Sequence, residues 1–176
     1  PGFENPIGSE WAVVYAGGAA ADFTTKGRDT ASKYTGAYGA HFQTTTDDSN
    51  KFAYLRQVVS GLTPGGTYNV SAWVKHVWDR TDKYYGYLEA VGGGPAQVSS
   101  ISTASWTQKT VSQIADAAGQ MEIRLWFKKT ATTVGKTCDV YFDDVSCVQS
   151  CTPPPAPAGV SAEPSVIVPG QSSTLS

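Results

Sequence analysis

The chain has 176 residues, a formal net charge of −2 at pH 7 and a sequence pI near 5.6. This charge balance gives no global attraction to phosphate backbones or to anionic lipid, so nucleic acid and membrane surfaces are poor default partners. No stretch approaches the roughly 20 apolar residues that a membrane-spanning helix needs, so we expect a soluble protein.

Composition favours an all-β protein. Glycine is plentiful (18 residues), aromatic residues make up 11% of the chain and charged residues only 16%. Thr, Ser, Val and Tyr are abundant, whereas the helix formers Leu and Met are scarce, and this balance is typical of strands joined by tight turns. Five Trp and nine Tyr exceed what a core of this size needs, which predicts an aromatic recognition surface.

Period-two alternation of apolar and polar residues predicts the strands in chain order. The expected strands in the first part of the chain are residues 2–5, 11–15, 38–43 and 51–59. Pro64, Gly65 and Gly66 then predict a turn, because proline fixes the first φ and glycine supplies the positive one.

The second part of the chain continues the pattern. Strands are expected at residues 68–77, 84–91, 106–111, 121–128 and 140–145. The residues predicted to face the core from two of them are Val70, Ala72, Val74, Ile123, Leu125 and Phe127. Strands at these intervals, without helical periodicity, indicate a two-sheet antiparallel β-sandwich.

The last predicted strand contains two adjacent carboxylates, Asp143 and Asp144, in an otherwise apolar run. Buried carboxylates are costly unless their charge is compensated. A calcium ion would compensate it, since carboxylate and backbone oxygens are its preferred ligands. The alternative is that one Asp faces solvent while the other caps a turn or accepts backbone hydrogen bonds.

The three cysteines are Cys138, Cys147 and Cys151. Cys138 and Cys147 would lie roughly 30 Å apart on one extended strand, so they are not expected to bond to each other. Cys147 and Cys151 can close a small loop, which would imply an oxidising compartment. Cys138 is expected to pack as a small hydrophobe.

A proline-rich segment follows the predicted sandwich. Residues 150–159 contain four of the chain's ten prolines and are expected to form a linker stiffened by polyproline geometry. Residues 160–176 look like the truncated start of a following β (immunoglobulin-like) domain. The predicted organisation is therefore a sandwich over residues 1–149, a linker and a domain fragment.

Several motifs over residues 1–149 resemble carbohydrate-binding modules of families 4, 9, 16 and 22. They are, in the same order as in those modules, Gly2-Phe3-Glu4, Trp11, Tyr34-Thr35-Gly36-Ala37-Tyr38, Leu62-Thr63-Pro64-Gly65-Gly66-Thr67-Tyr68, Ser71-Ala72-Trp73-Val74-Lys75 and Tyr141-Phe142-Asp143-Asp144-Val145. The resemblance implies a β-jelly-roll, non-catalytic and monomeric, that a linker joins to a catalytic domain in a secreted bacterial polysaccharide-degrading enzyme.

The resemblance also implies a structural calcium. Its ligands would be Glu4, the carbonyl of Gly2, a carbonyl within residues 33–36, and Asp143, with Asp144 as the alternate. With Glu4 added to the pair of aspartates, the metal is favoured over the solvent or turn-capping alternative.

The alternation predicts which side chains point away from the core towards a ligand. The candidates are Trp73, Lys75, Tyr85, Tyr87, Glu89, Arg124 and Trp126, flanked by Glu122 and Lys128. Aromatic rings stacked on sugars with polar groups around them are the usual physics of a glycan site. Lys75, Arg124 and Lys128 on one face would suit uronates, so neutral and acidic polysaccharides both stay open.

Other interpretations compete with this one. Trp73 and Trp126 could instead be edge residues of the core under a loop such as residues 77–83, the position also expected for Trp11 and Trp106. His41 is expected to be a satisfied surface histidine. Glu89 and Glu122 could form the carboxylate pair of a hydrolase or lyase, but no enzymatic activity is expected. A structural or adhesive domain shares the same sandwich.

Overall fold

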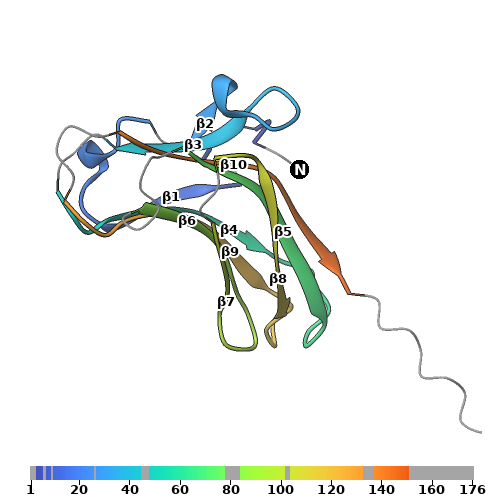
Figure 1. Ribbon diagram of the computed structural model, residues 1–176. Coiled ribbons are helices and arrows are strands. Elements are labelled where there is room, and N and C mark those ends of the chain that lie inside the picture. The colour runs from blue at the N-terminus through green and yellow to red at the C-terminus, as the bar shows by residue number, and fades with distance from the viewer. Residues whose placement is uncertain are drawn as a thin grey trace, which may run out of the picture.

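The computed structural model describes residues 3–5, 7–8, 10–25, 27–44, 48–77, 84–101, 104–132 and 137–150. These residues form two five-stranded antiparallel sheets packed face to face (Figure 1), which confirms the predicted all-β sandwich. The strands are β1 (Ala12–Gly17), β2 (Arg28–Asp29), β3 (Gly39–Thr44), β4 (Lys51–Val59), β5 (Thr67–Val77), β6 (Tyr84–Val91), β7 (Gln97–Ile101), β8 (Thr107–Ile114), β9 (Met121–Lys129) and β10 (Cys138–Gln149).

The chain passes repeatedly between the two sheets, as in a jelly roll. One sheet has the order β1-β4-β9-β6-β7 and the other the order β2-β3-β10-β5-β8. Both sheets bend in the same direction, so that the outer face of the first lies inside the bend and that of the second outside it (Figure 1). We call them the concave sheet and the convex sheet.

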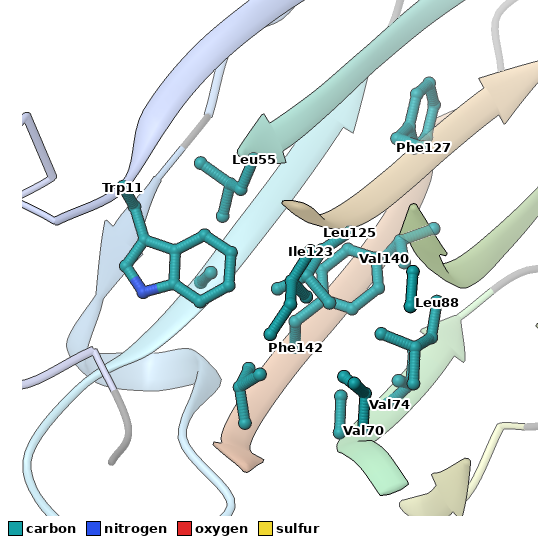
Figure 2. Close-up of a cluster of buried hydrophobic side chains, with 14 of the residues drawn as sticks. Trp11, Leu55, Val70, Val74, Leu88, Ile123, Leu125, Phe127, Val140 and Phe142 are labelled. Atoms are coloured by element: carbon teal, nitrogen blue, oxygen red, sulfur yellow. The ribbon is translucent and has the colours of Figure 1, made fainter. Parts of the chain in front are cut away.

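The core lies between the sheets and is made by the inward half of each alternation (Figure 2). The six residues predicted to face it are all at most 1% exposed. Phe127 packs edge-on against Phe23, with ring centroids 5.6 Å apart, and Phe23 packs in the same way against Phe42. Trp11 is 5% exposed and belongs to this cluster, as predicted.

Most predicted strands are confirmed within a few residues, and the exceptions have simple causes. No strand forms at residues 3–5, which the structure describes as bends and coil. The short strands β2 and β7 were not predicted, because Arg28–Asp29 is too short for a periodic signal and Gln97–Ile101 carries little apolar alternation.

The predicted turn before β5 has the expected conformation. The Gly66 N–H donates to the Thr63 carbonyl at 2.9 Å, and Gly65 has φ = 71°. Proline followed by a residue with positive φ is the pattern of a type II turn. This turn fixes the start of β5, which pairs with both β8 and β10.

Cys138 is fully buried and free, as predicted, and its burial raises the pKa of the thiol far above the ordinary range. Cys147 has no disulfide partner among the described residues. Its expected partner Cys151, like the proline-rich linker and residues 160–176, lies outside the described residues, so the bridge stays a prediction. In the described part of the chain the helices are two three-residue 3-10 segments, Ala20–Asp22 and Thr30–Ser32, and neither can cross a membrane.

His76 gives the fold a pH dependence that can be measured. Its side chain is 1% exposed, and its Nε2 lies 3.7 Å from the Cys138 Sγ. Burial lowers the pKa of His76, against a smaller opposing effect of Asp139. The unfolded chain therefore binds a proton at a higher pH than the folded one, and folding stability falls as pH drops through the unfolded pKa of about 6.5.

We expect the midpoint of thermal unfolding to fall between pH 7.5 and pH 5.5 (about one unit either side of that pKa). In His76→Gln this pH dependence becomes shallower, because glutamine does not titrate. Unfolding followed by circular dichroism at a series of pH values measures both slopes. Equal slopes in the two proteins would show that His76 does not carry the effect.

Candidate functional site on the concave sheet

The predicted ligand-binding residues lie on two opposite faces of the sandwich. Tyr87, Glu89, Arg124 and Trp126 come together on β6 and β9 of the concave sheet. Trp73 and Lys75 are on β5 of the convex sheet, so the prediction of one shared face is wrong for this pair. The alternation showed correctly which side chains point outward, but it carries no information about which sheet a strand joins.

Tyr85 occupies the β6 position opposite Lys128 on the concave sheet. Its side chain lies outside the described part of the structure, so its role in the site stays a prediction.

The strand register aligns positions of the concave sheet in four parallel rows. Across β4, β9 and β6 these rows are Phe52, Lys128 and Tyr85; Tyr54, Trp126 and Tyr87; Arg56, Arg124 and Glu89; and Val58, Glu122 and Val91. Neighbouring strands are roughly 4.8 Å apart, and successive rows are separated by two residues, or roughly 7 Å. The face therefore changes from aromatic to ionic to apolar along the strands.

The aromatic row is a stack of three rings. The Trp126 indole lies between Tyr54, at a centroid distance of 4.2 Å, and Tyr87, at 5.4 Å with planes only 16° apart. The rings therefore face one another across the strands, and the two tyrosines cover the faces of the indole. Trp126 is therefore neither buried in the core nor open on its faces. We call the stack of Tyr54, Trp126 and Tyr87 the aromatic wall; a ligand above the sheet would contact the edges of its rings.

The ionic row is joined to this wall through Glu89 and to the next row through Glu122. Glu89 Oε2 accepts from the Trp126 Nε1–H at 2.7 Å and from Arg124 Nη1 at 3.1 Å. Glu122 accepts from Arg124 Nε at 2.5 Å and from Arg56 Nε at 2.6 Å. Each guanidinium thus has at least one carboxylate partner, and each carboxylate has two donors.

These contacts set the protonation state of the row. Burial opposes ionisation of Glu122, but hydrogen bonds and charge attraction from Arg124 and Arg56 outweigh it and hold the pKa of this carboxyl below its usual range. Burial opposes the charge of Arg124 as well, but hydrogen bonds and charge attraction from Glu122 and Glu89 outweigh it and raise the pKa of Arg124. Glu122 is therefore ionised at neutral pH.

Lys128 adds a positive charge beside the wall. Its Nζ lies 5.1 Å from the centre of the Tyr87 ring and 5.4 Å from those of Trp126 and Phe52. These distances are within the range of cation–π attraction, which holds the ammonium group over the rings.

A shallow hollow of about 210 Å³ adjoins the ionic row at the far end of the strands. It is lined by Arg56, Val58, Val91, Gly92, Asp116, Gln120, Met121 and Glu122. Val58 is 46% exposed and offers an apolar flank, while Arg56 and Glu122 offer polar groups. Apolar flanks with a few polar groups are the usual lining of a small-molecule site.

The convex face carries a separate aromatic cluster. Tyr34, from the loop before β3, lies flat on Trp73 with centroids 4.0 Å apart and planes 18° apart. Trp106 tilts against Tyr34 at 5.5 Å, and Lys75 lies 4.5 Å above the Tyr141 ring. Trp106, expected at the edge of the core, is thus part of an outer surface, whereas Trp73 is half-buried because Tyr34 covers it.

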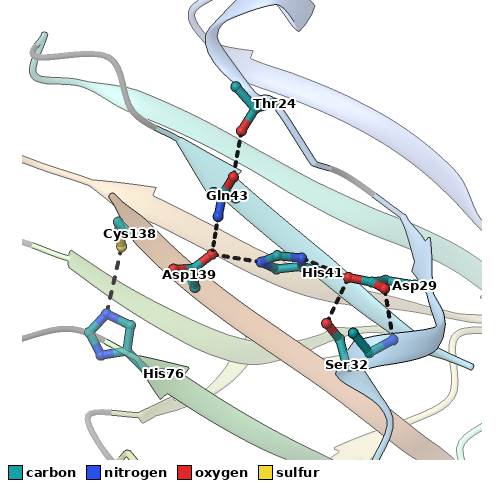
Figure 3. A network of polar contacts seen from close by, with 9 residues as sticks. Thr24, Asp29, Ser32, His41, Gln43, His76, Cys138 and Asp139 are labelled. Atoms are coloured by element: carbon teal, nitrogen blue, oxygen red, sulfur yellow. Dashed lines mark hydrogen bonds and ion pairs between the residues drawn. The ribbon is translucent and has the colours of Figure 1, made fainter. Parts of the chain in front are cut away.

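His41 anchors the middle of this convex face (Figure 3). Its Nε2 lies 2.8 Å from Asp139 Oδ1 and its Nδ1 lies 3.1 Å from Asp29 Oδ2, while the ring stacks on Tyr141 at 4.3 Å. Gln43 also donates to Asp139. His41 is satisfied, as predicted, but it is buried (6% exposed) and not at the surface.

Two of the predicted calcium ligands, Glu4 and Asp143, hold the same loop, residues 34–38. Asp143 is 1% exposed; its Oδ2 accepts from the N–H groups of Tyr34 at 2.7 Å and Thr35 at 3.0 Å, and its Oδ1 from that of Asp144 at 2.8 Å. Glu4 Oε1 accepts from the Ala37 N–H at 2.9 Å. Burial raises the pKa of Asp143, even though these hydrogen bonds favour its ionised form.

The strand and the loop adapt locally to make these contacts. Asp144 has φ = 46° where the pairing of β10 with β5 shifts register, and it accepts from the Thr35 hydroxyl at 2.7 Å. Gly36 has φ = 63°, and a Cβ there would collide with the Glu4 carboxylate. The loop therefore depends on glycine at this position.

This geometry satisfies the carboxylates with N–H donors, which is one of the alternatives the sequence left open. Calcium needs oxygen ligands, and the described residues contain no cluster of three or more His, Cys, Asp or Glu suited to a metal. The carbonyl of Gly2 lies outside the described residues. Calcium binding, which also depends on backbone carbonyls, therefore stays a prediction of the resemblance alone.

Sequence reasoning missed Tyr54 and Arg56 on the concave face. The alternation of Phe52, Tyr54 and Arg56 against Ala53 and Leu55 was a usable signal, but the strand was predicted without assigning its faces. Tyr34 and Tyr141 on the convex face could not have been placed, since they stack on Trp73 and His41, which are distant from them in the sequence.

Comparison with known proteins relates the fold to solved structures. No family model and no curated protein matches the chain. A family 61 carbohydrate-binding module in complex with β-1,4-galactotriose is 20% identical, with a TM-score of 0.59 over 85% of this chain and 95% of that one. The predicted resemblance to carbohydrate-binding modules is thereby confirmed for the fold.

Two further similar structures come from proteins that are named for different activities. The CBM22-1 and GH10 modules of Clostridium thermocellum endo-1,4-β-D-xylanase 10B, complexed with xylohexaose, are 16% identical, with a TM-score of 0.55 over 85% of this chain and 28% of that one. A cyclase from Fischerella sp. TAU is also 16% identical, with a TM-score of 0.56 over 85% and 93%. The fold therefore occurs with binding and with catalysis, and function has to be argued from the site.

Proposed function

We propose that this chain is a non-catalytic glycan-binding module that holds a polysaccharide on the outer face of its concave sheet. The observation that carries the proposal is the sequence of rows on that face: a rigid aromatic wall, a paired ionic row and a hollow with apolar flanks. Sugars have apolar C–H faces and rings of hydroxyl groups, which such a surface can contact together.

Similarity in fold supports the proposal. Two of the similar structures carry galactotriose and xylohexaose, and in one of them the module is joined to a glycoside hydrolase. By the same reasoning we propose that this module belongs to a secreted protein and directs an attached catalytic domain to its polysaccharide.

The chemistry of the carboxylates favours binding over catalysis. A glycosidase needs one carboxyl group that keeps its proton to act as a general acid. Glu122 is held ionised by two arginines, and Glu89 is occupied by Trp126 and Arg124. In this arrangement neither is placed to deliver a proton.

Native affinity electrophoresis against a panel of polysaccharides tests the proposal. We expect at least one polymer to retard the protein, without release of reducing ends or unsaturated uronates during incubation. Retardation by none would favour a structural or adhesive domain, and released products would reveal an enzyme.

A further inference from the structure

We infer that Glu89 is a positioning residue: it fixes the orientation of the Trp126 indole in the aromatic wall and does not itself bind the glycan. This inference rests on the proposed glycan-binding function and assigns a role within that site. The alternation along β6 placed Glu89 among the groups that contact a ligand, but its hydrogen bonds in the folded protein point to a different role.

Stacking alone leaves two orientations open to the indole. Trp126 lies between Tyr54 and Tyr87, and the planes of Trp126 and Tyr87 are 16° apart. The χ2 torsion of tryptophan is roughly two-fold, and a half-turn about the Cβ–Cγ bond keeps the ring in nearly the same plane. Both orientations would therefore face the tyrosines, but the indole N–H would point to opposite sides. A further contact is needed to select one of them.

Glu89 supplies that contact. The register places Tyr87 opposite Trp126 and Glu89 opposite Arg124, so Glu89 is the diagonal neighbour of Trp126 across β6 and β9. Diagonal neighbours are roughly 7–8 Å apart, within reach of long side chains. Glu89 Oε2 accepts from the Trp126 Nε1–H at 2.7 Å. This N–H is the only polar group of the side chain, and the opposite orientation would turn it away from its charged acceptor.

The ionic row holds Glu89 in place. Glu89 Oε2 also accepts from Arg124 Nη1 at 3.1 Å. Arg124 donates through Nε to Glu122, which accepts from Arg56 as well. A chain of charge-assisted hydrogen bonds therefore runs across β4, β9 and β6 and ends at the indole. The Glu89 side chain is only 13% exposed, so little of it is left for direct contact with a ligand.

This contact decides what the wall offers to a glycan. Because its N–H is used within the protein, the Trp126 indole presents only carbon atoms to a ligand, and these suit the apolar C–H groups of a sugar. Without Glu89 the ring would be free to turn, and the ligand would have to select one arrangement. Groups that are already ordered bind at a lower entropic cost, so the positioning contributes to affinity.

Glu89→Leu tests the inference, because leucine has no acceptor. We expect the affinity for the polymer selected by electrophoresis to fall about tenfold. Glu89→Gln keeps a neutral oxygen that can accept from the indole N–H, so we expect a loss of less than about threefold. Glu10→Leu is the matched control, since it removes a carboxylate that accepts from Asn5 in the segment before β1. We expect it to change the affinity by less than about twofold.

A double-mutant cycle separates positioning from direct contact. If Glu89 acts through Trp126, adding Glu89→Leu to Trp126→Ala lowers the affinity by less than about twofold, since no indole is left to position. A further loss of about tenfold in the double variant would show that Glu89 binds the glycan itself. That result would overturn the inference and leave glycan binding intact.

The Trp126 indole N–H signal in nitrogen–proton NMR spectra gives a readout that needs no glycan. In Glu89→Leu we expect the proton resonance to move upfield and its exchange with solvent to become at least about tenfold faster. In Glu89→Gln and Glu10→Leu we expect the signal to stay closer to its original position. Circular dichroism checks folding; Glu89→Thr, whose side chain is too short to reach the indole, gives the same prediction if Glu89→Leu does not fold.

The outcomes separate this inference from the function on which it rests. An unchanged Trp126 N–H signal in the folded Glu89→Leu or Glu89→Thr variant would overturn the positioning role, whatever the protein binds. Retardation of the unmodified protein by no polymer in the panel would overturn the proposed function, while the NMR comparison would still show whether Glu89 holds the indole.

Discussion

Trp126→Ala is expected to lower the affinity for the bound glycan by about thirtyfold, or about 2 kcal/mol, the loss typical of a central aromatic anchor. The indole is the middle of the three-ring wall and holds Glu89 through its N–H. Without it Tyr54 and Tyr87 lose their shared partner, and Glu89 loses one of its two donors. Isothermal titration with the polymer or oligosaccharide selected by electrophoresis measures the change.

Trp73→Ala is the matched control for this experiment. Trp73 is also a half-buried tryptophan stacked on a tyrosine, but it lies on the convex sheet. We expect its affinity to match that of the unmodified protein within about twofold. Circular dichroism of both variants confirms that they fold, and a loss of affinity in Trp73→Ala alone would move the site to the convex face.

Asp143→Ala is expected to reduce the free energy of unfolding by about 3 kcal/mol, because it leaves three N–H groups without their charged acceptor. Those groups belong to Tyr34, Thr35 and Asp144. In a domain of about 150 residues this corresponds to a fall in the unfolding midpoint of about 6–12 °C. Chemical denaturation gives the free energy directly.

Asp144→Asn is the control for Asp143→Ala. Asparagine tolerates the left-handed conformation at this position and keeps an oxygen for the Thr35 hydroxyl, so we expect a loss below about 1 kcal/mol. Similar losses in both variants would show that the hydrogen bonds to Asp143 are not the reason. Repeating the curves with calcium and with EDTA tests the predicted metal: a higher midpoint with calcium supports it, and an unchanged midpoint counts against it.

Alternation along single strands was enough to predict the sandwich and the part of the candidate site that lies on β6 and β9. The inward set of β5 and β9 follows from period two alone, because burying the other face would place Lys75, Glu122 and Arg124 in the core. The same alternation showed that Trp73 and Trp126 point outward. What it could not show is that β5 and β9 belong to different sheets, since strand order depends on pairing between distant segments.

The pairing of charges was also beyond the sequence. Arg56 and Glu89 come from β4 and β6, and only the register of these strands with β9 places them beside Arg124. Treated one by one, the cations kept an acidic ligand open beside a neutral one. The structure shows that both guanidinium groups share their charge with carboxylates of the protein. The same holds for loop 34–38, because the hydrogen bonds from its N–H groups to Asp143 join segments that are distant in the sequence.

The most direct test of the central claim follows the indole N–H signals of the protein in nitrogen–proton NMR spectra as glycan is added. We expect the signal of Trp126, whose N–H donates to Glu89, to shift with ligand concentration while those of Trp73 and Trp106 stay in place. A spectrum in which the Trp73 and Trp106 signals move and the Trp126 signal does not would contradict it.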